Sequence, residues 1–211
     1  MKEFKTEQES FWAGAFGDEY IDRNNDHKII SSNTNMFSQV LSKTAGIKSV
    51  IEFGSNIGLN LYAIRALMKD VEFSAVEINK KAFSILKEVE WIKAYNQTIL
   101  EFEPDYQRDL ALIKGVLIHV NPEELPKVYE LLYKSSRKYI CIAEYYNPTP
   151  VSVNYRGNND RLFKRDFAGE MMDKFDLSLI DYGFCYHRDN NFPQDDLNWF
   201  LLEKKDHNRG K

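Results

Sequence analysis

The fold expected of this chain is decided by the stretch Val50-Ile-Glu-Phe-Gly-Ser-Asn-Ile-Gly-Leu-Asn-Leu61. Its short apolar run ends at Gly54, and an apolar-periodic segment typical of a helix begins at about Gly58. A buried strand that turns sharply into a helix indicates an α/β nucleotide-binding unit. Asn56 stands where the dinucleotide fingerprint G-x-G-x-x-G has its second glycine, which lets the backbone approach a pyrophosphate. We therefore expect a ligand without a pyrophosphate.

The same stretch offers groups that suit a small charged ligand. The helix N-terminus presents free N–H groups and a positive dipole end to an anion such as a carboxylate. Glu52, at the end of the strand, places a negative charge where it could meet an ammonium. A ligand with a carboxylate, an ammonium and a nucleoside but no phosphate is S-adenosylmethionine, and Glu-x-Gly-x-x-x-Gly resembles the first motif of the class I methyltransferases. The alternative is a strand–helix turn that binds no ligand.

A second expected strand, over residues 71–77, also ends in an acid. Glu77 lies 23 residues after Gly54, close to the ~20 expected when a carboxylate after the second strand binds ribose hydroxyls. The alternative is that Glu77 only caps the helix that starts near Asn79. The two motifs together predict a cofactor site that contains Glu52, Gly54, Ser55, Asn56, Gly58, Glu77 and Ile78.

Length and composition fit one ordinary globular domain. The chain has 211 residues, 43% hydrophobic and 28% charged. Its formal net charge of −4 argues against a general nucleic-acid binder, which needs a basic face. No apolar run approaches the ~18–20 residues that span a bilayer, and no signal-peptide pattern opens the chain. Cys141 and Cys185 fit neither a disulfide framework nor a metal site, so we expect a cytoplasmic protein with free thiols, no metal and no membrane partner.

Strands and helices alternate along the body of the chain, as a parallel sheet requires. The expected helices cover residues 60–69, 80–89 and 165–175, with another that begins at Asn121-Pro122. The later strands are expected at 91–97, 110–116, 139–144, 177–187 and 197–203. We expect an α/β fold of the Rossmann-like class I methyltransferase type, with a mostly parallel seven-stranded sheet that closes in an antiparallel hairpin.

The segments outside this body have their own expected roles. Residues 1–45 predict an N-terminal helical lid, in which a helix with an N-cap between residues 31 and 35 precedes the core of residues 46–205. Residues 145–163 lack periodicity, which predicts a long functional loop. Residues 206–211 form a polar tail, and the whole is one domain.

Further cofactor and substrate residues are expected at the carboxyl ends of the strands. In the lid, Trp12, Tyr20 and Arg23 could close on the methionine end and the substrate, or simply pin the segment to the body. Asn96, Gln97 and Thr98 follow the third strand, where an amide or hydroxyl could form a hydrogen bond with the adenine. Lys114 and Gly115, at the end of the fourth strand, are the last candidates for cofactor binding.

His119 is the candidate general base, because it follows the fourth strand and its ordinary pKa suits proton transfer near neutral pH. The alternative is a hydrogen-bonded histidine at a helix start. Tyr145 and Tyr146 leave the fifth strand toward the same crevice, or pack at its edge. A basic cluster could bind a sugar carboxylate or phosphate, or could be solvated, and its members are Arg156, Arg161, Lys164 and Arg165.

A closer resemblance covers most of the chain. The segments that carry it are Phe11-Trp12…Phe16-Gly17-Asp18-Glu19-Tyr20…Arg23-Asn24, Glu52–Gly58, Lys114-Gly-Val-Leu-Ile-His119, Tyr145-Tyr146-Asn147-Pro148, Asp160–Phe167 and Asp181-Tyr-Gly-Phe…Tyr186-His187-Arg188-Asp189. They resemble the pseudaminic acid biosynthesis-associated methylases. The resemblance implies methyl transfer from S-adenosylmethionine, with S-adenosylhomocysteine as product, to a nonulosonic sugar, its nucleotide derivative or a precursor. The expected partner is thus a small, anionic sugar.

The sequence lacks the motifs of methyltransferases that act on other kinds of acceptor. Exocyclic-amine DNA methylases carry an Asn/Asp-Pro-Pro-Tyr/Phe motif where this chain has Lys114-Gly-Val-Leu. Cytosine C5 enzymes need a Pro-Cys nucleophile, and neither cysteine follows a proline. Catechol-type enzymes need a carboxylate metal cluster that we cannot assemble. Two readings stay open: a methyltransferase of a nucleic-acid or protein acceptor, and a cofactor-binding scaffold without catalysis.

Overall fold

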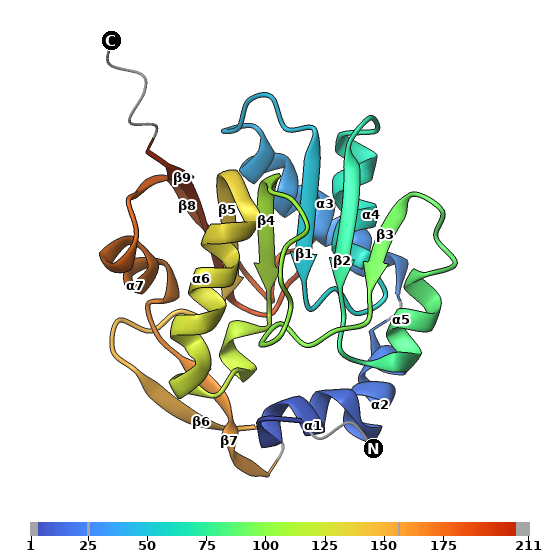
Figure 1. Ribbon diagram of the computed structural model, residues 1–211, viewed down its shortest axis with the longest axis vertical. Coiled ribbons are helices and arrows are strands. Elements are labelled where there is room, and N and C mark those ends of the chain that lie inside the picture. Colours follow the sequence, from blue (N-terminus) through green and yellow to red (C-terminus); the bar gives the residue numbers. More distant parts are fainter. Residues whose placement is uncertain (1–3, 25, 156, 206–211) are drawn as a thin grey trace.

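A computed structural model of the protein, which describes residues 4–24, 26–155 and 157–205, has a seven-stranded sheet with helices on both faces (Figure 1). The strands lie in the order β3-β2-β1-β4-β5-β9-β8. Strands β1 to β5 are parallel, and β9 and β8 close the sheet as an antiparallel pair. Their bounds are Ser49–Phe53 (β1), Glu72–Val76 (β2), Ile92–Tyr95 (β3), Arg108–Lys114 (β4), Ser136–Glu144 (β5), Leu177–Cys185 (β8) and Leu197–Lys204 (β9). The expected fold is confirmed.

Seven α-helices are present in the described residues. They are α1 (Glu7–Ala13), α2 (Ala15–Arg23), α3 (His27–Leu41), α4 (Leu59–Leu67), α5 (Lys80–Leu86), α6 (Leu125–Ser135) and α7 (Phe167–Lys174), with short 3₁₀ turns at Leu117–His119 and Pro122–Glu124. In Figure 1, α6 and α7 lie in front of the sheet while α3 and α4 lie behind it, and α1 and α2 run beneath its lower edge. Within the described part of the chain, none of these helices is long and apolar enough to cross a membrane.

The two faces of the sheet bury separate hydrophobic clusters, as an α/β architecture requires. Ile51 and Phe53 of β1 pack in the cluster on the side of α6 and α7. Val50, on the opposite face of the same strand, packs with residues of α3 and α4. Every residue of β1 is buried, which explains why the strand reads as a nearly continuous apolar run.

Two local expectations were wrong. The stretch 145–163 is not a loop throughout, because β6 (Val151–Tyr155) and β7 (Asn158–Lys164) pair as an antiparallel hairpin. Apolar Val151, Val153 and Tyr155 alternate along β6 with polar residues, a period-2 signal that the neighbouring prolines obscured. Helix α3 begins earlier than expected, because the side chain of Asp26 accepts a hydrogen bond from the N–H of Lys28 at 2.9 Å and so caps the helix there.

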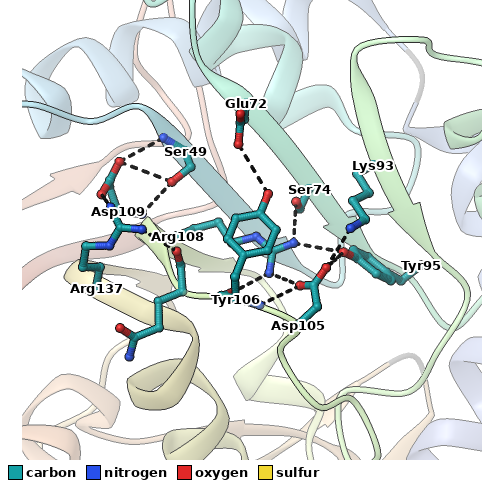
Figure 2. Close-up of polar contacts among 11 residues, drawn as sticks. Ser49, Glu72, Ser74, Lys93, Tyr95, Asp105, Tyr106, Arg108, Asp109 and Arg137 are labelled. Atoms are coloured by element: carbon teal, nitrogen blue, oxygen red, sulfur yellow. Dashed lines mark hydrogen bonds and ion pairs between the residues drawn. The ribbon is translucent and has the colours of Figure 1, made fainter.

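A buried polar network holds the amino end of β4, away from the carboxyl edge of the sheet (Figure 2). The fully buried guanidinium of Arg108 donates to Asp105 at 2.5 Å and to the hydroxyl of Ser74 at 2.9 Å. The Oδ2 atom of neighbouring Asp109 accepts from the N–H groups of Lys48 at 2.8 Å and Ser49 at 3.2 Å. These contacts join β4 to β1 and β2 at the edge opposite the site described next.

Candidate active site

A cavity of about 720 Å³ opens at the carboxyl ends of the parallel strands. Residues that follow β1, β2, β3, β4 and β5 line it, together with residues of α1, α2 and the β8–β9 connection. It lies where the strand order reverses between β1 and β4, the place where open α/β sheets bind ligands. Its volume is within the roughly 300–1,000 Å³ of small-molecule sites.

The β1–α4 loop forms one wall, and its backbone needs left-handed conformations. Gly54 has φ 73°, and an added Cβ would meet the Cγ2 atom of Val116 at 2.5 Å. Asn56 has φ 48°, a conformation that asparagine tolerates better than most residues. Gly58, with φ 84°, is the N-cap residue of α4 and does not line the cavity. Of the predicted loop residues, Gly54, Ser55 and Asn56 line the cavity.

Glu77 joins this loop to the end of β2. Its carboxylate accepts hydrogen bonds from the backbone N–H groups of Asn56 and Asn79, both at 2.7 Å. Burial raises the pKa of Glu77, although these hydrogen bonds lower it in part. The N-cap of α5 is the side chain of Asn79, which accepts from the N–H of Ala82 at 3.0 Å. Each oxygen of a carboxylate has two acceptor sites, so Glu77 keeps capacity for ligand hydroxyls. Glu77 and Ile78 both line the cavity.

Glu52 lies beneath the cavity and not on its surface. It is fully buried, its Oε1 accepts from the amide of Asn60 at 2.5 Å, and its Oε2 has no hydrogen-bond partner among the described residues. Burial raises the pKa of Glu52 to about 8. Asn60 and Lys114 line the cavity, and burial lowers the pKa of Lys114 while the charge of Glu52 opposes that shift. Gly115 lines it as well.

Of the three residues predicted to bind the adenine, only Thr98 lines the cavity in the described part of the chain. Thr98 lines the cavity, and its hydroxyl donates to Oε1 of Glu9, a buried carboxylate of α1. Asn96 instead donates to the backbone oxygens of Glu77 at 2.9 Å and Ile78 at 3.2 Å, which supports the loop after β2. Gln97 is exposed and does not line the cavity.

Helices α1 and α2 line the cavity and also contact the body of the protein. Closure of this segment on a ligand stays a prediction. The ring of Trp12 lies 5.3 Å from that of Tyr20 and 4.7 Å from that of His119. Asn79 donates to Asp18 of α2 at 2.8 Å. Trp12, Tyr20 and Arg23 all line the cavity.

His119 is a buried part of the cavity wall. Its Nδ1 lies 2.5 Å from the backbone oxygen of Arg161 and therefore carries the proton, since a carbonyl only accepts. The imidazole packs between Trp12 and Tyr155, whose ring lies 5.2 Å away. Burial lowers the pKa of His119 to about 4. The imidazole is consequently neutral near pH 7, with Nε2 as its acceptor atom.

The predicted substrate residues are mostly outside the cavity. Tyr145 lines it, whereas Tyr146 is 40% exposed and does not. Arg161 pairs with Glu7 at 2.9 Å, and the ammonium of Lys164 lies 5.0 Å from the centre of the Tyr145 ring. Neither cation lines the cavity. Two further members of the basic cluster remain: Arg165 pairs with Glu170 at 2.6 Å, and Arg156 lies outside the described residues.

Sequence reasoning missed several polar residues of the cavity, which are Glu9, Asn60, Glu144, Gln194 and Asp195. Glu144 ends a buried strand, so the rule that found Glu52 and Glu77 could have found it. Asp195 lies in the β8–β9 connection and Glu9 in α1, and tertiary packing alone brings both to the site. Among the described lining residues, Glu9, Glu77, Glu144 and Asp195 are acids and only Arg23 and Lys114 are cations. The described side chains form no group of three or more His, Cys, Asp or Glu residues that could hold a metal ion.

Solved structures share this fold at low sequence identity, whereas no protein-family model and no curated protein matches the chain. Magnesium protoporphyrin IX methyltransferase from Synechocystis PCC 6803, with bound SAH (S-adenosylhomocysteine), is 12% identical with a TM-score of 0.69, over 93% of this chain and 97% of that one. The 1,6-didemethyltoxoflavin-N1-methyltransferase from Burkholderia thailandensis, also 12% identical, has a TM-score of 0.69 over 94% and 87%. A SAM (S-adenosylmethionine)-dependent methyltransferase from Leishmania major is 13% identical, with a TM-score of 0.70 over 92% and 81%. The chain therefore has the Rossmann-like fold of the SAM-dependent methyltransferases.

Proposed function

We propose that the protein is a SAM-dependent methyltransferase that acts on a small molecule. The observation that carries the proposal is the cavity at the switch point, where Glu77 joins the two loops that a nucleoside ligand would contact. The shared fold supports it, because the compared proteins from Synechocystis and Burkholderia have SAH bound. The volume of the cavity, about 720 Å³, fits a small acceptor beside the cofactor.

The lining residues fit the parts of S-adenosylmethionine in the order of the strands. Glu77 would bind the ribose hydroxyls, and Thr98 would lie at the adenine. The amide oxygen of Asn60, which has no hydrogen-bond partner in the described part of the chain, would accept from the ammonium of the methionine. Arg23 and Lys114 are the cations available to its carboxylate. The other residues proposed for the cofactor site shape the loops around it, and Tyr20 lines the cavity. These loop-shaping residues are Glu52, Gly54, Ser55, Asn56, Gly58, Ile78 and Gly115.

When bound, S-adenosylmethionine supplies an electrophilic methyl group on a positively charged sulfur. The protein's part is to hold the acceptor in line with that group and to exclude water. Trp12, Tyr20 and Tyr145 line the cavity, and aromatic faces stabilise a desolvated cation by about 2 kcal/mol. The role of His119 as a base stays a prediction, and its pKa of about 4 makes it a weak proton acceptor near pH 7.

The acceptor proposed from the resemblance is a nonulosonic sugar, its nucleotide derivative or a precursor. In the described part of the chain, Arg23 and Lys114 are the cations that line the cavity, so one could bind the methionine carboxylate while the other binds a sugar carboxylate. The predicted contribution of Arg161 and Lys164 would require them to reach the acceptor from outside the cavity. A cytoplasmic location remains part of this proposal.

The proposal is tested with S-adenosylmethionine labelled in its methyl group. The protein is incubated with three separate acceptor pools from the source cells: a protein-free ultrafiltrate, total protein and total nucleic acid. We expect label in the ultrafiltrate, in a compound whose mass increases by one CH₂ group. Label in protein or nucleic acid would instead support a polymer acceptor, and no transfer to any pool would support the scaffold reading. The Glu77→Ala variant is the control: methyl transfer that depends on the cofactor site should be weaker in this variant.

A further inference from the structure

Glu144, the last residue of β5, lines the cavity, and one oxygen of its carboxylate has no hydrogen-bond partner in the described part of the chain. The residue is only 3% exposed. Oε1 accepts hydrogen bonds from the backbone N–H groups of Val116 and Leu117, both at 2.9 Å, which fixes the carboxylate. Oε2 is buried and has no hydrogen-bond partner in residues 4–24, 26–155 and 157–205. The carboxylate is thus held by one oxygen while the other has no donor.

Such an arrangement is costly unless a ligand completes it. A buried polar atom without a partner costs about 1–3 kcal/mol, and more when it is charged. Asp109 shows that buried acids of this protein need not bear that cost. Its Oδ2 accepts from the backbone N–H groups of Lys48 and Ser49. Its Oδ1 pairs with Arg137 at 3.2 Å (Figure 2). Among the described residues, the buried carboxylate oxygens without a partner belong to Glu52, beneath the cavity, and to Glu144, which lines it.

The position of Glu144 places it on the acceptor side of the cavity. Glu77, the proposed ribose ligand, follows β2, whereas Glu144 ends β5, two strands beyond β1 in the sheet. The switch point between β1 and β4 separates these two sides. Tyr145, Tyr155 and Asp195 of the β8–β9 connection also line the cavity. Tyr145 interacts electrostatically with Glu144, Tyr155 and Asp195, so these residues lie near one another. The cofactor's methyl group would point toward this side, because its nucleoside occupies the other.

We infer that Oε2 of Glu144 binds the nucleophilic O–H or N–H group of the acceptor and takes its proton as the methyl group arrives. This inference rests on the proposed function. The acceptor atom is therefore a hydroxyl oxygen or an amine nitrogen that carries hydrogen. Methylation of a carboxylate would be disfavoured, since two carboxylates would repel each other in a buried site.

The step balances in atoms and charge. The new bond forms between the acceptor atom and the methyl carbon, and the bond between that carbon and sulfur breaks. The electron pair of the broken bond stays on sulfur, which becomes a neutral thioether. The acceptor's proton moves to Oε2, so the carboxylate becomes a neutral carboxylic acid. Positive and negative charges disappear together, and no isolated charge is left in the buried cavity.

The surroundings of Glu144 suit a proton acceptor near neutral pH. Burial raises its pKa to about 7, while the backbone N–H groups of Val116, Leu117 and Ile118 and the charge of Lys114 on β4 lower it in part. Tyr129 of α6 and Tyr145 also interact with it electrostatically, and burial raises the pKa of each. Asp195 interacts with Lys114 and Tyr145 from the β8–β9 connection. A base is most effective when its pKa lies near the working pH.

The test replaces Glu144 by glutamine, which keeps the oxygen that accepts from Val116 and Leu117 but removes the proton acceptor. The probe is the protein-free ultrafiltrate with methyl-labelled S-adenosylmethionine. We expect the initial rate to fall by about 10²–10⁴-fold, with SAH affinity and Tm unchanged. The wild-type rate should rise with pH through about 7, and the residual rate of Glu144→Gln should be flat there. Asp109→Asn, a buried acid at the opposite edge of the sheet, is the matched control and should keep the wild-type rate.

Two further variants make the outcome decisive. Glu144→Asp keeps a carboxylate and should recover part of the lost rate together with its pH dependence. A wild-type rate in Glu144→Gln, or an unchanged pH profile, would overturn the inference while the proposed function stood. Loss of rate in both Glu144→Gln and Glu144→Asp, together with lost SAH binding, would show a structural role and also overturn it. A wild-type protein that binds no SAH would refute the proposed function itself, and this inference with it.

Discussion

Replacing His119 by glutamine should make the protein less sensitive to acid. The pKa of His119 falls from 6.5 to about 4 because the ring is buried. The unfolded chain therefore binds more protons than the folded one between these pH values, and the protein loses stability as the pH falls through them. Each unit of pKa corresponds to ~1.4 kcal/mol, so His119 should remove about 2 kcal/mol between about pH 7 and about pH 4.5. Glutamine cannot titrate, and its amide can still donate to the carbonyl of Arg161.

The assay is urea unfolding of both proteins at the two pH values. Glu52 and Glu144 have raised pKa values, and so they stabilise the folded state as the pH falls from neutral. Their effect is common to wild type and variant, so the difference between the two proteins isolates His119. We expect the variant to lose about 2 kcal/mol less than wild type. An equal loss in both proteins would refute the inference that a neutral imidazole is buried in the cavity wall.

Three other outcomes are expected. Glu77→Ala should weaken SAH binding by ~1.5–3 kcal/mol, because charge-assisted hydrogen bonds to the ribose are lost; an unchanged affinity in calorimetry would mean that Glu77 only joins the two loops. Gly54→Ala should lower Tm more than Gly115→Ala does. Both positions have positive φ, but only a Cβ at residue 54 would meet Cγ2 of Val116, at 2.5 Å. Equal losses of Tm would exclude that contact as the cause. His119→Gln should keep most of the methyl-transfer rate at neutral pH, whereas a loss of 10²–10⁴-fold would assign the base to His119.

Sequence reasoning succeeded where local pattern and topology determine the structure. The strand that ends at Gly54 and the acid at Glu77 follow from strand periodicity and loop spacing, and the structure places Gly54 and Glu77 at one cavity. Glu9 could not be found in this way, because its helix reaches Thr98 only through packing of segments 89 residues apart. The hairpin over residues 151–164 was hidden by the prolines that precede it.

The predicted basic cluster shows a different limit of the sequence. Its members are close in the chain and carry one sign of charge, but each of the three that the structure describes contacts a different neighbour in the fold. Arg161 meets Glu7, Arg165 meets Glu170, and Lys164 lies over Tyr145. Charge spacing along the chain does not reveal such pairs, because they depend on where α1, α7 and the hairpin meet.

Titration calorimetry with S-adenosylmethionine, SAH and NAD is the most direct test of the central claim. The missing second glycine at Asn56 and the acid at Glu77 predict a nucleoside site without room for a pyrophosphate. We expect S-adenosylmethionine and SAH each to bind at one site per chain and NAD not to bind. Binding of NAD, or no binding of either methionine-derived ligand, would contradict the account.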